Sequence, residues 1–143
     1  MNYENILYSK EEGIATVTLN RPDKLNALDA KILQEMVRAI DKAREDDEVK
    51  VLIITGVGRG FCSGADLTSP VRGTDPKQPG ITRPTRLEPF IGFGALSKRL
   101  RNFHKPAIAA INGLTTGGGL TVACLCDMRI ASENARFSAI FVR

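Results

Sequence analysis

Two glycine-rich segments carry the backbone groups best suited to chemistry, and each follows an apolar run. The first segment spans Gly56–Leu67 and the second Asn112–Leu120. Glycines let the backbone approach a ligand closely, and a turn that opens a helix presents free N–H groups. One N–H group from each turn would therefore form an oxyanion hole if the two met on a single oxygen. A structural role for the same glycines, in tight turns and close helix–sheet packing, stays open at this point.

A nucleotide-binding interpretation of the first turn fits poorly. Gly56-Val57-Gly58-Arg59-Gly60 follows a predicted strand, as a dinucleotide fingerprint does, but its third glycine falls one residue early. No periodic helix opens after it. The chain also has no Gly-Lys-Ser/Thr ending, so the pattern of a phosphate-binding P-loop is absent from the sequence.

The cysteines favour packing over chemistry. The chain has an odd number of cysteines, Cys62, Cys124 and Cys126, and their spacing is not that of a disulfide framework. If Cys124 and Cys126 lie on one helix, their side chains point about 200° apart and cannot chelate one metal. A nucleophilic Cys62 would need a base, and nothing pairs it with the single histidine, His104. We expect reduced thiols and no metal site.

Composition is that of an ordinary globular protein. Hydrophobic residues make up 43% and charged residues 25%, and the net charge of +4 suits an anionic ligand better than it predicts nucleic-acid binding. No apolar run reaches the ~18–20 residues that span a bilayer, and the N-terminus lacks a basic signal region. The expectation is a cytoplasmic protein with no membrane or nucleic-acid partner. The basic cluster Ser97–Lys105 is either a solvated helix face or an attractor of phosphates.

Strands and helices are expected to alternate along the chain. Asp29 is a plausible N-cap for an amphipathic helix that runs to about Glu45, and five of the seven prolines fall in an irregular stretch, 70–92. The remaining predicted elements are strands at Ile14–Asn20, Val49–Thr55, Ala107–Ile111, Met128–Ala131 and Phe137–Val142, and helices at Phe93–Phe103 and Leu120–Cys126. This alternation predicts an α/β fold with right-handed crossovers.

Three motifs together resemble the crotonase (enoyl-CoA hydratase/isomerase) superfamily. They are Thr18–Leu28, Gly60–Leu67, and Lys105–Gly113 continued through Gly117-Gly118-Gly119. The resemblance covers about Ile6 to Phe137, in order and with the expected intervals. It implies an α/β fold of repeated ββα units, the ClpP/crotonase spiral, and one acyl-CoA-binding domain over residues 1–143.

The resemblance also implies roles for individual residues. In that family the N–H groups at the positions of Ala65 and Gly118 donate to the thioester oxygen and stabilise an enolate. The CoA thioester is itself the substrate, so no separate cofactor is implied. Full-length members form trimers or hexamers and act in fatty acid metabolism. The remaining family positions that contact substrate correspond to Lys24, Leu25 and Ala27 on the CoA path, and to Ser63, Asp66 and Leu67 beside the acyl group.

The sequence departs from the hydratase pattern at both acid positions. Hydratases of the family use two glutamates as general acid and base, and here the corresponding residues are Thr121 and Phe141. A hydroxyl of ordinary pKa is no proton base, so Thr121 is expected only to bind water or substrate, and Phe141 only to shape an apolar pocket. No proton-transfer residue can be assigned. Hydratase, isomerase or other enolate chemistry all remain open.

Length is the second departure. Family members carry nearly as much chain again on the C-terminal side, including helices that close the pocket and mediate trimer packing. We expect a domain incomplete at the C-terminus, with a self-sufficient short form as the alternative. The rival function is that of a catalytically silent remnant that binds CoA or a protein partner.

Overall fold

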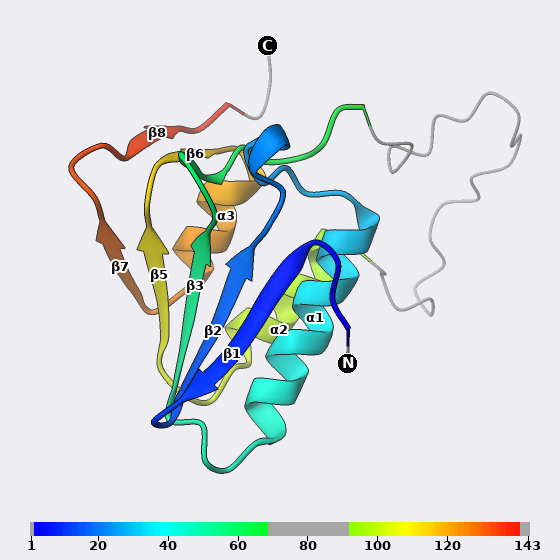
Figure 1. Ribbon diagram of the computed structural model, residues 1–143, viewed down its shortest axis with the longest axis vertical. Coiled ribbons are helices and arrows are strands. Elements are labelled where there is room, and N and C mark those ends of the chain that lie inside the picture. Colours follow the sequence, from blue (N-terminus) through cyan, green and yellow to red (C-terminus); the bar gives the residue numbers. More distant parts are fainter. Residues whose placement is uncertain (1, 69–91, 141–143) are drawn as a thin grey trace, which may run out of the picture.

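The computed structural model describes residues 2–68 and 92–140 (Figure 1). Most of the proline-rich stretch 70–92 and the candidate pocket residue Phe141 lie outside these ranges. None of the described helices is long and apolar enough to cross a membrane.

The larger of two sheets has five strands in the order β1-β2-β3-β5-β7. β1 (Ile6–Glu11) runs antiparallel to β2 (Ile14–Leu19), and β3 (Val51–Gly56), β5 (Ala107–Ile111) and β7 (Met128–Ala131) continue parallel to β2. Figure 1 shows these strands side by side, with the carboxyl ends of the four parallel strands, β2, β3, β5 and β7, toward the glycine-rich turns.

The smaller sheet lies where those turns are. Its strands are three residues long and parallel, in the order β4 (Gly60–Cys62), β6 (Leu114–Thr116) and β8 (Arg136–Ser138). Each of them follows a strand of the larger sheet in sequence. The chain therefore reads β1-β2-α1, β3-β4-α2, β5-β6-α3 and then β7-β8, which confirms the expected repetition of ββα units.

Three helices cover one face of the larger sheet. α1 (Ala30–Glu45) begins as predicted at Asp29, whose carboxylate accepts a hydrogen bond from the backbone N–H of Ile32 at 2.9 Å. α2 (Phe93–Arg101) packs beside α1, and α3 (Gly118–Leu125) follows β6. Alternate strand residues form the buried face beneath them: Ala15, Val17, Leu19, Leu52, Ile54, Ala107, Ala109 and Ile111.

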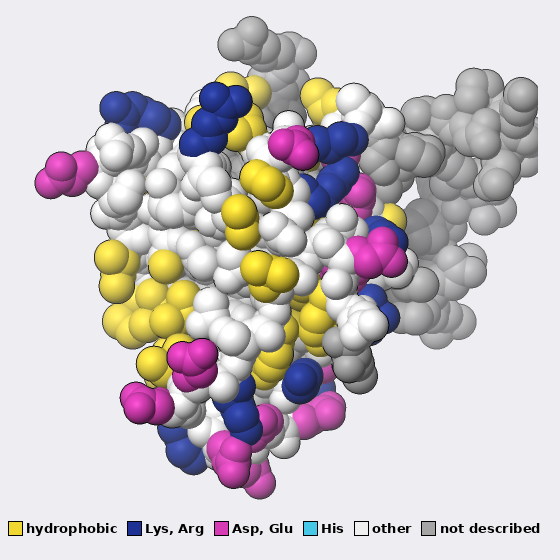
Figure 2. Space-filling view, in the orientation of Figure 1, with side chains coloured by type: hydrophobic (Ala, Val, Ile, Leu, Met, Phe, Trp, Pro, Cys, Tyr) yellow, Lys and Arg dark blue, Asp and Glu magenta, His cyan; other side chains and the backbone are white. Residues whose placement is uncertain are grey.

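β7, at the edge of the larger sheet, and β8, at the edge of the smaller one, both expose large apolar side chains. All four residues of β7 are exposed, and Met128 and Ile130 keep 49% and 65% of their surface in contact with solvent. Figure 2 shows hydrophobic side chains gathered over β5 and β7.

The structure corrects several predicted boundaries. β1, β4 and β6 were not predicted, because β1 carries charged residues near its end and the other two are only three residues long. The predicted strand Phe137–Val142 is the shorter β8 within the described residues, and the helix predicted over Leu120–Cys126 begins two residues earlier, at Gly118. That earlier start matters, because it places Gly118 in the first turn of α3.

Candidate functional site

The two glycine-rich turns touch each other at Gly64 and Gly118. A Cβ atom built on Gly64 would lie 3.1 Å from the Gly118 nitrogen and 2.9 Å from the Thr116 carbonyl oxygen. The Thr116 hydroxyl also donates to the carbonyl of Ser63 at 2.7 Å. Gly64 has a φ of +91°, which an L side chain rarely adopts. Glycine is therefore required at position 64 both by its conformation and by the closeness of the second turn.

The direction of the Ala65 N–H group is set by Leu28. The backbone N–H of Leu28 donates to the Gly64 carbonyl at 2.7 Å, and the backbone N–H of Asp66 donates to the Leu28 carbonyl at 2.9 Å. In a planar trans peptide the C=O and N–H bonds point in opposite directions. The N–H of Ala65 therefore points away from Leu28. Ala65 is exposed, and across residues 2–68 and 92–140 its N–H group has no hydrogen-bond acceptor.

The Gly118 N–H group is fixed by the start of α3. The Gly117 carbonyl accepts from the backbone N–H of Thr121 at 3.1 Å, so the N–H of the same peptide, that of Gly118, points out of the helix N-terminus. Gly117 has a φ of +49° and makes this turn possible. Like that of Ala65, the Gly118 N–H group has no acceptor within the described parts of the chain.

Apolar side chains stand beside the Gly118 donor. A Cβ atom on Gly118 would lie 3.4 Å from Cδ1 of Leu28 and 3.5 Å from Cε2 of Phe93. Leu28 is buried and Phe93, at the start of α2, is half-buried. Sequence reasoning missed Phe93 as a site residue, because only the fold brings the start of α2 against the second turn. The free N–H group of Gly118 thus lies beside an apolar wall, where a hydrogen bond is stronger than in water.

Comparison with known proteins identifies the family. Residues 9–143 match the enoyl-CoA hydratase/isomerase family. The chain belongs to this family. Among its relatives, it is 37% identical over 138 residues to the 1,2-epoxyphenylacetyl-CoA isomerase of Escherichia coli and 39% identical over 142 residues to the short-chain-enoyl-CoA hydratase of Clostridium acetobutylicum.

The structural match agrees with the sequence match. An enoyl-CoA hydratase from Mycobacterium avium subsp. paratuberculosis superposes with a TM-score of 0.76 at 29% identity, covering 96% of this chain and 48% of that one. The two curated relatives are covered over 51% and 50% of their lengths, while 96% of this chain is matched in each. The chain therefore has the crotonase fold and spans about half the length of the relatives it matches.

Asp66, a predicted neighbour of the acyl group, is occupied by other contacts in this family member. Its side chain is 5% exposed and accepts hydrogen bonds from Arg21 at 2.9 Å, Lys24 at 3.1 Å and the Thr68 hydroxyl at 2.6 Å. The Thr68 hydroxyl, with Arg21 and Lys24 behind it, holds the pKa of the Asp66 carboxyl well below its usual range. Asp66 is thus ionised and fully partnered at neutral pH, which excludes it as a general acid.

The predicted CoA-path segment lies next to the first turn. The backbone N–H of Ser63 donates to the Leu25 carbonyl at 2.9 Å, and the Ser63 hydroxyl donates to the Lys24 carbonyl at 3.3 Å. Ala27 is 7% exposed, whereas half of the Lys24 side chain is accessible. Leu67, the other predicted pocket residue, is 73% exposed. The structure thus brings this segment and the first glycine-rich turn together, with Lys24 and Leu67 reaching the surface.

Asn26, inside that segment, is a buried residue that sequence reasoning did not single out. Its amide oxygen accepts from the backbone N–H of Arg21 at 2.8 Å, and its amide nitrogen donates to the carbonyls of Val57 and Gly60 at 3.0 and 2.8 Å. It is fully buried and has a φ of +57°. An Asn within an irregular segment between a strand and a helix was the available signal, since Asn tolerates the left-handed conformation.

At the position of the first family glutamate, Thr121 bonds to its own helix. Its hydroxyl donates to the Gly117 carbonyl at 3.4 Å, on the first turn of α3. Phe141, at the position of the second, lies outside the described residues. The described residues therefore bring together the two turns that carry Ala65 and Gly118, and they show no proton-transfer group at the first family acid position.

Two of the three cysteines are packed in the interior, as predicted, and the third is exposed. Cys62 and Cys126 are buried, Cys124 is exposed, and all three are free thiols. Burial raises the pKa of Cys62 and of Cys126 to about 12, which rules out a thiolate nucleophile at neutral pH. Within the described residues no three His, Cys, Asp or Glu side chains cluster as metal ligands would.

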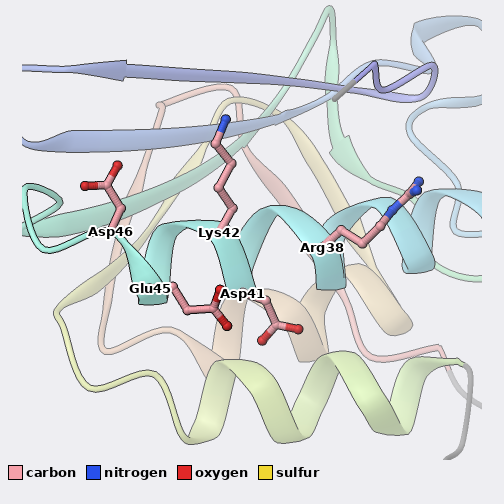
Figure 3. Close-up of a pocket in the computed structure, with 5 residues that line it drawn as sticks. All are labelled: Arg38, Asp41, Lys42, Glu45 and Asp46. Atoms are coloured by element: carbon pink, nitrogen blue, oxygen red, sulfur yellow. The ribbon is translucent and has the colours of Figure 1, made fainter.

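A cavity of about 390 Å³ lies away from the turns, along the exposed side of α1 (Figure 3). Every side chain that lines it has an ion-pair or ring partner already. The cavity is lined by Arg38, Asp41, Lys42, Glu45 and Asp46. We therefore place the candidate site at the turns, where hydrogen-bond donors are free, and not in this cavity.

Proposed function

We propose that this family member binds an enoyl- or acyl-CoA thioester and stabilises its enolate with the N–H groups of Ala65 and Gly118. One observation carries the proposal. The two donors sit on turns in van der Waals contact, each is held by a hydrogen bond to the carbonyl of its own peptide, and neither has a protein acceptor within the described residues.

This arrangement suits the chemistry because the charge moves during reaction. When a proton leaves the α carbon, or a nucleophile adds to the β carbon, the electron pair passes to the thioester oxygen. Two fixed N–H groups then strengthen their hydrogen bonds without reorganising. Losing one such donor slows comparable enzymes by about 10²–10³-fold, or ~3–4 kcal/mol.

We base the proposed reaction class on the names of the matched relatives. One matched relative is named as an isomerase and another as a hydratase. We propose the same enolate-forming step for this chain, nominally hydration or isomerisation. The same proposal, resting on the family resemblance, includes one acyl-CoA-binding unit over residues 1–143 and a trimer or hexamer of the whole protein. It also includes a cytoplasmic location and a role in fatty acid metabolism.

A second candidate is a protein that binds CoA esters or a partner without turnover. The contacts of Asp66 and Thr121 favour it. The carboxylate that follows Ala65 in the chain, that of Asp66, is paired with Arg21 and Lys24. The residue at the first glutamate position, Thr121, donates its hydroxyl to a carbonyl of its own helix turn.

Binding and turnover separate the two candidates. Acetoacetyl-CoA binding is measured by calorimetry, and hydration of crotonyl-CoA and isomerisation of a 3-enoyl-CoA by absorbance. Ala65→Pro removes the N–H donor, whereas Ala65→Gly keeps it and serves as the matched control. The enolate proposal predicts that Ala65→Pro lowers turnover at least ~100-fold while Ala65→Gly stays within a few-fold of the parent.

Each outcome decides between the candidates. Binding without any turnover supports the silent CoA-binding protein. Equal activity of the proline and glycine variants contradicts the role assigned to the Ala65 N–H group. If acetoacetyl-CoA does not bind at high micromolar concentration, both candidates fail as CoA-ester binders.

A further inference from the structure

Arg21 joins the two segments whose contact sets the direction of the Ala65 N–H group. One guanidinium nitrogen donates to the Ala27 carbonyl at 2.7 Å and lies 3.0 Å from a carboxylate oxygen of Asp29. The other donates to Asp66 at 2.9 Å. These partners flank Leu28 on one side and Ala65 on the other. A single side chain therefore spans both strands of the Leu28–Ala65 bridge.

Apart from Arg21, the same two segments are joined by the N–H and hydroxyl of Ser63, which donate to the carbonyls of Leu25 and Lys24, and by Lys24, which donates to Asp66. Leu28 and Ala65 form an isolated parallel bridge, outside any sheet, with one hydrogen bond to Gly64 and one from Asp66. An isolated bridge gains nothing from neighbouring ladder bonds. The Ser63 bonds lie at one end, before Leu28, whereas Arg21 contacts Ala27, Asp29 and Asp66, the residues on either side of the bridge itself.

Burial makes these contacts strong. The Arg21 side chain is 14% exposed, and those of its two carboxylate partners, Asp29 and Asp66, are 18% and 5% exposed. Charge-assisted hydrogen bonds in such surroundings are stronger than those at the surface. The lysine that also contacts Asp66, Lys24, is half exposed and reaches it with one ammonium group, so it cannot span the bridge as the planar fork of Arg21 does.

We infer that Arg21 is a positioning residue for the oxyanion hole: by clamping the segments of Leu28 and Asp66 it fixes the peptide that presents the Ala65 N–H group. Arg21 itself touches no reacting atom in this scheme. The inference rests on the proposed function, since it assigns the N–H of Ala65 to the thioester oxygen. It predicts that Arg21→Lys changes the direction of the Ala65 N–H group while leaving the fold in place.

The test measures polarisation of a bound carbonyl. The probe is 4-dimethylaminocinnamoyl-CoA, a conjugated thioester whose absorption band moves to longer wavelength when its carbonyl oxygen accepts hydrogen bonds. The parent chain, Arg21→Lys and the matched control Arg44→Lys are titrated with it. Arg44 pairs with Asp41 at 3.0 Å on α1, so its replacement also exchanges an ion-paired arginine. Far-UV circular dichroism confirms that each variant is folded.

The expected result is the same band shift in the parent and in Arg44→Lys. In Arg21→Lys the shift should be at most half as large, and the probe should bind about tenfold more weakly. A full shift in folded Arg21→Lys overturns the positioning role and leaves the proposed function standing. A parent chain that binds the probe without a shift, or does not bind it, overturns the proposed function and this inference with it.

A second variant covers the case in which Arg21→Lys does not fold. Asp66→Asn keeps the shape of the Arg21 partner and removes its charge. A reduced band shift in folded Asp66→Asn supports the clamp. A full shift there, or failure of both variants to fold, shows that the contact only stabilises the fold and overturns the positioning role.

Discussion

Replacing Asn26 with alanine should destabilise the protein more than any other single change of a polar side chain near the site. Asn26 is fully buried and satisfies three backbone groups: the N–H of Arg21 and the carbonyls of Val57 and Gly60. These groups belong to the segment before α1 and to the turn that leads into β4. The amide therefore holds the segment before α1 against the first glycine-rich turn.

The magnitude follows from the bonds that are lost. Three hydrogen bonds to buried backbone groups at ~1 kcal/mol each give about 3 kcal/mol, because water cannot replace the missing partner. Asn26 also has a φ of +57°, where alanine is strained by about 1 kcal/mol more than asparagine. The total of about 4 kcal/mol corresponds to a fall in Tm of roughly 10–15 °C for a chain of this size.

Urea unfolding followed by far-UV circular dichroism measures the effect, since the chain has no tryptophan. Asn26→Gly relieves the backbone strain but loses the same bonds, so it should be about 1 kcal/mol more stable than Asn26→Ala and still ~3 kcal/mol below the parent. Glu12→Gly is the matched control, because Glu12 has a φ of +47° in an exposed turn, and it should be at least as stable as the parent. An Asn26→Gly variant as stable as the parent would refute the reasoning.

Two further predictions concern the glycines and the thiols. Gly113→Ala should prevent stable folding, because its Cβ would lie 2.1 Å from the Arg59 carbonyl oxygen. Gly60→Ala is the control, since the atom nearest to its Cβ would lie at an ordinary 3.4 Å, and the yield of soluble protein and the Tm of the two variants are compared. At pH 8 a thiol reagent should modify the exposed Cys124 at once, and Cys62 and Cys126 only in denaturant; rapid labelling of all three in the native protein would contradict the burial. The free energy of unfolding should also fall as the pH rises above ~9, because the two buried thiols have a pKa of about 12 in the folded protein and ionise first in the unfolded chain.

Local signals predicted the elements that local physics controls. The Asp29 cap and the apolar spacing of α1 were visible in the sequence, because capping and amphipathicity act within a few residues. β4 and β6 were not predicted. A strand of three residues has no periodicity to read, and each is stabilised by partners from distant parts of the chain.

For the site, the sequence predicted that two glycine-rich turns would meet, and the family resemblance predicts Ala65 and Gly118 as the donors. Only the tertiary structure decided how they meet. The direction of the Ala65 N–H depends on a hydrogen bond from Leu28 to Gly64, and the closeness of the turns depends on the missing side chain of Gly64 against Gly118. A peptide plane is oriented by its hydrogen-bond partners, and when those partners come from distant segments no local pattern can specify its direction.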